Sequence, residues 1–297
     1  MGKNYPIIFR SVKNKNAFFY DVANARRCNI PSGYDGVDIC FPQEAGPEDF
    51  EAMQITLLCC LIGEFDKKGY AISFAQNTYP LQKFLDEEIC IHQYWGENKS
   101  DHVDIPDENG LALWRVVEKR IVPYSQAIHE FLKRKYFADL DLSALEMALM
   151  EMYYNVYDHA LAEGIAFSYI KYQEETGKIY VAVCDFGQGI AQSLRTKYPS
   201  FSDDKEAVKQ SLKKGISAQT RENNKGMGLN DIVSFLGQDD ALRIVSNRAF
   251  LICIGNKIKK TYDLNFDFCG TLLYFDILVK NFEKEDLVES FTLKEEQ

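Results

Sequence analysis

The longest apolar run in the chain covers residues 55–63, and its length limits what the chain can fold into. The run is about as long as the core of one helix and falls well short of the roughly 18 residues that a membrane span needs. Around it, residues 48–65 are predicted to form a helix, with Glu48 and Asp49 favouring the first turn. The apolar face of this helix would be Met53, Ile55, Leu57, Leu58 and Leu61. No part of the chain is expected to cross a membrane.

A β/α alternation surrounds this helix. Residues 36–41 and 70–75 are predicted strands that flank it, and residues 80–88 are a second predicted helix. A strand–helix–strand–helix run with this spacing favours parallel strands joined by a right-handed crossover. We therefore expect an N-terminal α/β domain over residues 1–95.

Composition and charge exclude several classes of protein. Hydrophobic residues are 46% and charged residues 26% of the 297, which is ordinary for a globular protein and rules out a disordered or collagen-like chain. The net charge is −10. Neither part of the chain is basic, so sequence-independent nucleic-acid binding is not expected.

The cysteines and the first residues favour a cytoplasmic protein. None of the eight cysteines forms a Cys-x-x-Cys pair, and most lie in apolar stretches. We expect buried, reduced thiols rather than disulfides or a metal site. The first residues carry no long apolar segment of the kind found in secretory signals.

The rest of the chain divides into three stretches. Residues 96–110 are polar and interrupted by Gly and Pro, and are the expected linker. Residues 111–280 form a second expected domain, and residues 281–297 a charged tail. In the second domain the sequence predicts helices at 124–137 and 142–162, a β-hairpin at 165–184, and strands at 242–245, 250–254 and 271–278.

Three polar residues share one face of the predicted helix 142–162. Glu151, Asn155 and Asp158 are spaced i, i+4 and i+7. A carboxylate, an amide and a second carboxylate in line suit a divalent cation and a water. Taken alone, the same spacing is more typical of a solvated helix face.

Three further motifs follow in order. Asp185 ends a predicted strand and is followed by Gly187 and Gly189, glycines that allow close backbone approach to a flat ligand. Residues 223–230 form a glycine-containing loop that enters a helix, where backbone N–H groups suit phosphate oxygens. The last motif, Gly270-Thr271, opens the final strand. Each of these motifs alone is uninformative.

Together, the four motifs resemble those of the GHKL superfamily of ATPases and kinases, which includes gyrase, the ninety-kilodalton heat-shock chaperones, sensor histidine kinases and MutL. The resemblance covers about residues 120–280. It implies a Bergerat-type α/β sandwich with a mixed sheet under the helices, and it implies ATP and Mg²⁺ as ligands. The matching residues are Glu151, Asn155 and Asp158 for the N box, Asp185, Gly187, Gly189 and Ile190 for the G1 box, Lys225, Gly226, Met227, Gly228 and Leu229 for the G2 box, and the late Gly270-Thr271.

The resemblance also implies a role for each residue. Asn155 would ligate the Mg²⁺ that bridges the ATP phosphates. Asp185 would accept a hydrogen bond from the adenine amino group, with support from Thr271 through water. Residues 226–228 would contact phosphates, and residues 200–227 would be a mobile lid over the nucleotide.

Glu151 occupies the position of the general base in the hydrolytic members of the superfamily. Kinases related to anti-sigma factors also carry a Glu there, so Glu151 does not separate hydrolysis from Ser/Thr phosphotransfer. A sensor-kinase phosphoacceptor at His129 is disfavoured because His129 lies too close to Glu151 in the sequence for a separate dimerising hairpin. We expect His129 to be an ordinary helix-face residue.

The N-terminal region is similar in pattern to STAS domains, the fold of anti-anti-sigma factors. Phosphorylated STAS proteins carry a Ser or Thr where the helix after the strand begins. Here residues 43–49 contain no hydroxyl, which argues against a self-phosphorylated switch.

The sequence therefore leaves two functional hypotheses. The first is a cytoplasmic, Mg²⁺-dependent ATP-binding regulator that acts on a protein partner or a homodimer contact by slow ATP hydrolysis or by Ser/Thr phosphotransfer. The alternative is a non-catalytic interaction module that uses ATP as a structural or sensing ligand.

Overall fold

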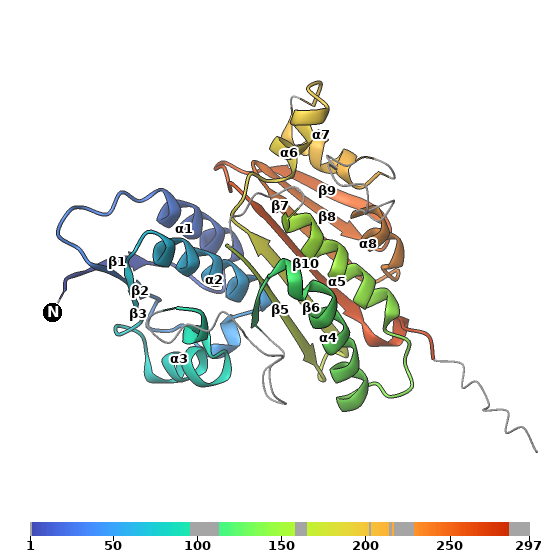
Figure 1. The fold of residues 1–297 in the computed structure, drawn as a ribbon, viewed down its shortest axis with the longest axis horizontal. Coiled ribbons are helices and arrows are strands. Elements are labelled where there is room, and N and C mark those ends of the chain that lie inside the picture. The colour runs from blue at the N-terminus through green and yellow to red at the C-terminus, as the bar shows by residue number, and fades with distance from the viewer. Residues whose placement is uncertain are drawn as a thin grey trace, which may run out of the picture.

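The chain folds into an α/β protein with two sheets (Figure 1). The computed structural model describes residues 2–95, 113–157, 165–201, 203–213, 216 and 229–284. A parallel three-stranded sheet with helices comes first, and a seven-stranded antiparallel sheet with helices follows. Within the described residues, no helix has both the length and the apolar composition needed to cross a bilayer.

The N-terminal sheet has the strand order β1-β2-β3, and both pairings are parallel. The prediction of a parallel β/α alternation is confirmed, because β2 and β3 fall inside the two predicted strands and pair directly. The sequence did not predict β1 and α1. The bounds are β1 Asn4–Ile8, α1 Lys15–Arg27, β2 Gly36–Cys40, α2 Ala52–Lys67, β3 Ala71–Ser73 and α3 Tyr79–Lys83, which continues as a π-helical turn over Phe84–Glu88.

The second sheet has the strand order β4-β5-β6-β10-β7-β8-β9. All of its described pairings are antiparallel, so the expectation of a mixed sheet is wrong. The reason is the position of β10, which returns between β6 and β7 and separates two strands that run in the same direction. The bounds are β4 Leu113–Arg115, β5 Ala166–Gln173, β6 Lys178–Asp185, β7 Ala241–Ser246, β8 Ala249–Ile254, β9 Lys257–Asp263 and β10 Thr271–Leu278.

Helices of the second part pack on one face of this sheet (Figure 1). Helix α4 lies against α5, and α5 contacts α8, so the three form a connected layer. The helices α6 and α7 pair with each other, and α7 contacts β8. The bounds are α4 Ile121–Lys135, α5 Ser143–Asn155, α6 Ile190–Lys197, α7 Asp204–Ser211 and α8 Leu229–Phe235.

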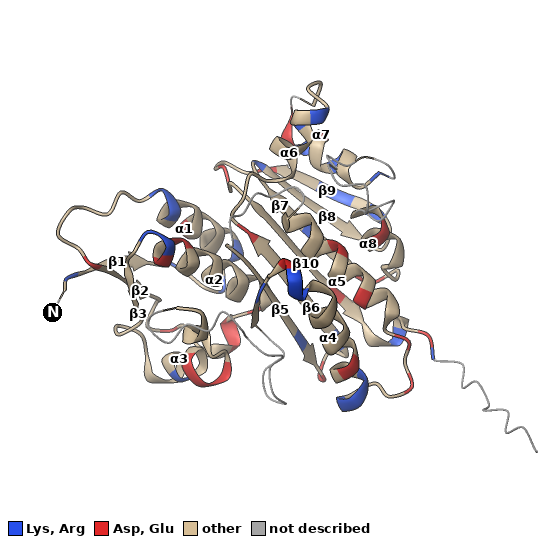
Figure 2. Ribbon diagram, viewed as in Figure 1, with Lys and Arg blue, Asp and Glu red and all other residues tan. Residues whose placement is uncertain are grey.

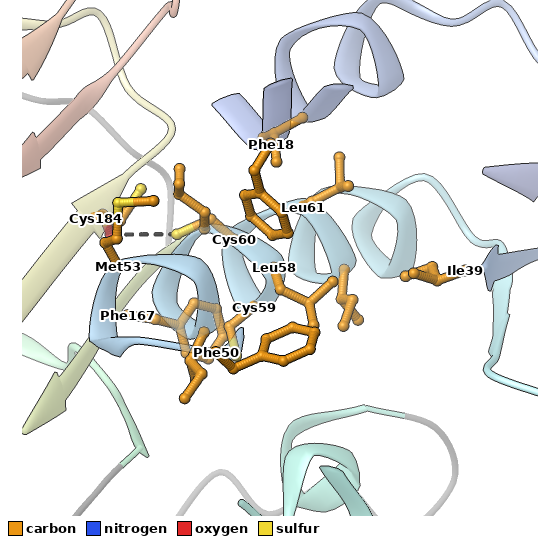
Figure 3. Packing of buried hydrophobic residues seen from close by; sticks show 14 of the residues in the cluster. Phe18, Ile39, Phe50, Met53, Leu58, Cys59, Cys60, Leu61, Phe167 and Cys184 are labelled. Atoms are coloured by element: carbon orange, nitrogen blue, oxygen red, sulfur yellow. Dashed lines mark hydrogen bonds between the residues drawn. The ribbon is translucent and has the colours of Figure 1, made fainter. Parts of the chain in front are cut away.

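Helix α2 lies between the two sheets. Figure 3 shows Cys60 directed toward Cys184 of β6, while Ile39 of β2 lies on the other side of the helix. The thiol of Cys60 donates to the carbonyl oxygen of Cys184 at 3.3 Å. Nearly the whole of α2 is buried, which is the state expected of a helix that is apolar on all sides. The apolar run that the sequence predicted as a helix core is therefore the centre of the molecule.

The central strands β6 and β10 of the seven-stranded sheet are covered on both faces. In β6, Val181 and Val183 belong to the core under α4 and α5, whereas Ala182 and Cys184 belong to the core around α2. Strand β10 alternates in the same way. An antiparallel sheet with one wet face would show polar residues at every second position, so the continuous burial of β6 and β10 reflects a helix layer on each side.

Several sequence expectations can be placed on this fold. All eight cysteines lie in the described part of the chain and are free thiols, and five of them are buried. The expected linker 96–110 lies outside the described residues, as does the tail beyond Lys284. Figure 2 shows acidic and basic residues interspersed over both parts of the fold.

Candidate functional site

The centre of the candidate site lies at one end of two central strands of the sheet, where β6 ends and β10 begins. Asp185 is the last residue of β6, and it pairs directly with Thr271, the first residue of β10. Both side chains are largely buried, with 5% and 8% of their surface exposed. The motif at Asp185 and the motif at Gly270-Thr271 are thus adjacent in space, because antiparallel pairing brings the end of one strand beside the start of its neighbour in the sheet.

The carboxylate of Asp185 is buried at this point. Its Oδ1 accepts a hydrogen bond from the backbone N–H of Gly187 at 2.8 Å. Burial raises the pKa of Asp185 to about 7, although the Gly187 N–H, the charge of Arg26 and the backbone N–H of Thr271 act in the opposite direction. A carboxylate in this state gains stability from any further N–H donor that approaches it.

Two glycines allow the turns around the end of β6 to pack closely. Gly270 has a φ of +148°, and a Cβ there would collide with the backbone oxygen of Asp185. Gly189 has a φ of +80° and precedes helix α6, and a Cβ there would meet the side chain of Asn247. Both positions therefore require glycine, for conformational and for steric reasons.

A hydrogen-bond network that the sequence did not predict holds these turns together. The hydroxyl of Ser246 accepts from the N–H of Ile190 at 2.8 Å and donates to the carbonyl of Gly270 at 2.9 Å. The amide of Asn247 donates to the carbonyl of Gln188 at 3.0 Å. No motif marked Ser246 or Asn247, since a Ser-Asn pair after a strand is an ordinary turn.

The N-box residues that the structure describes lie at the end of α5. Asn155 donates from Nδ2 to the carbonyl oxygen of Glu151 at 2.8 Å and to its Oε1 at 3.0 Å. The structure brings Glu151 and Asn155 together as the spacing predicted. The third residue of the motif, Asp158, lies outside the described residues.

The glycine-loop prediction can be examined only at its end. Lys225, Gly226, Met227 and Gly228 lie outside the described residues, together with half of the predicted lid 200–227, whereas residues 204–211 of the lid form α7. Leu229 begins α8 and is buried in the core under the sheet. Ile190 begins α6 and contributes its backbone N–H to the Ser246 network.

His129, which the sequence analysis disfavoured as a phosphoacceptor, contacts a neighbouring helix. It lies on α4, and its Nδ1 is 2.7 Å from Oε2 of Glu146 on α5. The pair joins two neighbouring helices.

A cleft in the described part of the chain lies elsewhere. It has a volume of about 570 Å³ and is formed between the start of α2 and the charged end of the sheet face that α2 covers. Its floor includes Lys178 and Arg243, which both bind the carboxylate of Asp276 at 2.6 Å. None of the ATP-site residues predicted from the sequence lines this cleft.

No protein-family model matches the chain, and no curated protein matches it. Among the described residues, no three His, Cys, Asp or Glu side chains are grouped so that they could hold a metal ion. Functional inference therefore depends on the motifs and on the geometry around Asp185.

Proposed function

We propose that the chain is a cytoplasmic, Mg²⁺-dependent ATP-binding regulatory protein of the GHKL type. In this proposal the seven-stranded sheet and its helices form a Bergerat-type ATP-binding sandwich, and the N-terminal part is a STAS-like domain. The nucleotide state would control a protein partner or a contact between two copies of the chain.

The environment of Asp185 is the observation that carries the proposal. A buried carboxylate whose pKa stays raised despite hydrogen bonds from the backbone N–H groups of Gly187 and Thr271 gains stability from a further donor. The exocyclic amine of adenine is such a donor, and Asp185 has the position that the G1 box gives to the adenine-binding carboxylate. Gly270 is compatible with the same assignment, because the absence of a Cβ lets the turn before Thr271 pass close to the backbone of Asp185.

The arrangement at the end of α5 suits a magnesium ion shared with phosphates. The amide nitrogen of Asn155 is held by Glu151, which leaves the amide oxygen as the atom for a metal. Mg²⁺ takes oxygen ligands and commonly completes its shell with phosphates and water, so one protein ligand is compatible with binding. When bound, the ion would neutralise phosphate charge, and Glu151 would activate water or a partner hydroxyl.

The N-terminal part favours a regulatory role over a self-contained switch. Its β-α-β topology is compatible with a STAS-like domain. Residues 43–49, which precede α2, contain no hydroxyl that could be phosphorylated. If the chain transfers phosphate, this segment would not be the acceptor, and we place the acceptor on a partner.

One observation favours the non-catalytic alternative. Oε1 of Glu151 already accepts a hydrogen bond from Asn155 at 3.0 Å. A general base needs to reach its proton donor directly or through one water. A Glu151 that stays bound to Asn155 would position the metal ligand and leave ATP as a structural or sensing ligand.

A comparison of the wild type with Glu151→Ala separates these two functions. Binding of MgATP, release of phosphate and transfer of labelled γ-phosphate to proteins of the source cell are measured for both. Turnover that disappears in Glu151→Ala while binding persists supports the enzyme. Tight binding with no turnover in the wild type supports the non-catalytic module instead.

A further inference from the structure

The last turn of α1 reaches across to the candidate site. The guanidinium of Arg26 donates through Nη1 to the carbonyl oxygens of Phe268, at 3.0 Å, and of Cys269. The next residue, Arg27, donates to the carbonyl oxygen of Asp267. Helix α1 is therefore bonded to the turn that leads directly into Gly270-Thr271.

The same guanidinium contacts the other turn of the site. Its central carbon lies 3.8 Å from the ring centroid of Phe186, within cation–π distance. Nη2 of Arg26 also lies 3.5 Å from the carbonyl oxygen of Phe186. Phe186 directly follows Asp185, so one side chain touches both turns that frame the buried carboxylate.

Arg26 is held in this orientation by the N-terminal part. Its Nε donates to Oε2 of Glu64 on α2 at 2.7 Å, and both side chains are only about 15% exposed. The planar guanidinium has donors in a fixed fork, so fixing Nε also fixes the direction of the two Nη groups. The contact of Cys60 with Cys184 in Figure 3 attaches α2 to β6 independently.

We propose that Arg26 is a positioning residue for the base end of the nucleotide site, through which the N-terminal part sets the affinity for the purine. The inference rests on the proposed function and adds a regulatory link to it. A partner that docks on the N-terminal part and displaces α1 would withdraw Arg26 and loosen the turns at Phe186 and Cys269. Base binding would weaken, while the phosphate end of the site would keep its affinity.

The test compares Arg26→Ala with a conservative variant and a matched control. Arg26→Lys keeps the positive charge but loses the planar set of N–H donors of the guanidinium. Arg10→Ala removes another arginine of the N-terminal part, whose Nε pairs with Asp21 at the same distance of 2.7 Å. Circular dichroism and thermal unfolding establish that each variant is folded.

The first readout needs no nucleotide. Backbone hydrogen exchange is measured by mass spectrometry in peptides that contain residues 186–189 and 269–272. Arg26→Ala is expected to raise exchange in both turns by about tenfold, since buried hydrogen bonds to a charged group are lost. Arg10→Ala should leave these peptides unchanged. Unchanged exchange in Arg26→Ala overturns the inference.

The second readout separates the two ends of the site. Calorimetry measures the binding of MgATP, of adenosine and of magnesium tripolyphosphate. In Arg26→Ala the affinities for ATP and adenosine should fall about tenfold or more, tripolyphosphate should bind as before, and Arg26→Lys should recover part of the loss.

Two outcomes contradict the inference at this step. An equal loss for adenosine and tripolyphosphate would mean that Arg26 acts only through general stability, and wild-type affinity in Arg26→Ala would mean that it does not position the site. If the wild type binds none of the three ligands, the proposed function is overturned together with the inference. Failure of the inference alone is therefore distinguishable, because the wild type then still binds the ligands.

Discussion

Asp185 is a carboxylate that the fold keeps out of water at the end of β6. Its pKa of about 7 in the folded chain lies above the usual value of 3.8 for an aspartate. Between these values the folded chain therefore binds more protons than the unfolded chain. The free energy of unfolding contributed by this group is then highest below about pH 4 and falls as the pH rises to about 7.

Asp185→Asn should remove this penalty while keeping an oxygen for the Gly187 N–H. We expect the variant to be more stable than the wild type by about 1–3 kcal/mol at pH 8, and the difference to shrink toward pH 5. Urea unfolding at the two pH values measures it. A difference that does not depend on pH would contradict the assignment of the raised pKa.

At the scale of single residues, the sequence predicted part of this site. Asp185 and Thr271 were expected in one site from motif order, and strand pairing brings them together. Ser246 and Arg26 could not be found in this way, since neither lies in a motif. Arg26 reaches Cys269 from a part of the chain that is distant in sequence, and only the tertiary fold defines such a contact.

Among the elements, α2 contains a glycine that is closely packed and yet has room for a methyl group. Gly63 lies inside α2, and a Cβ there would meet Phe167 at 3.4 Å and Ile165 at 3.6 Å, which are ordinary contacts. Gly63→Ala should therefore raise the free energy of unfolding by about 0.5–1 kcal/mol, because alanine favours the helix. Denaturant titration tests this, and a destabilised variant would show that α2 has no room for a methyl group.

Gly270→Ala is expected to have the opposite effect. Its Cβ would collide with the backbone of Asp185, which cannot move without disturbing the pairing of β6 with β10. Gly69→Ala is the matched control, because Gly69 has a positive φ of +84° but open space around it. We expect a loss of about 1 kcal/mol at Gly69 and clearly more at Gly270. Equal losses would mean that only backbone conformation matters.

Element boundaries were predictable where the pattern was strong. The predicted helix 48–65 corresponds to α2 preceded by a 3-10 turn over Pro47–Asp49. Strand β1 was missed because Pro6 interrupts it, and the structure tolerates this proline because β1 is the edge strand of its sheet. Strand β9 was missed because this edge strand is mostly exposed and lacks apolar alternation.

In the whole molecule, one hydrophobic core joins the N-terminal part to the second sheet. Ile39 of β2, Leu58 of α2 and Phe167 of β5 belong to the same buried cluster. The sequence could not predict that the two sheets share a core. The buried residues of α2 are apolar on all sides of the helix, and an apolar residue type does not tell which sheet it will contact. Helix α2 therefore forms a central layer between the two sheets.

A shared core predicts cooperative unfolding. Differential scanning calorimetry should record a single transition, with equal calorimetric and van't Hoff enthalpies. The reason is that α2 packs against both sheets, so unfolding of either part exposes apolar surface that the other part buries. Two separable transitions would mean that the packing around α2 does not couple the two parts.

Binding of ATP is the most direct test of the account as a whole. Isothermal titration calorimetry with MgATP is compared for the wild type, for Asp185→Asn, and for Asp38→Asn, another buried strand carboxylate that lies in the other sheet. We predict saturable wild-type binding that EDTA abolishes, an affinity at least about tenfold weaker in Asp185→Asn, and wild-type affinity in Asp38→Asn. No binding by the wild type, or equal binding by the wild type and Asp185→Asn, would contradict the account.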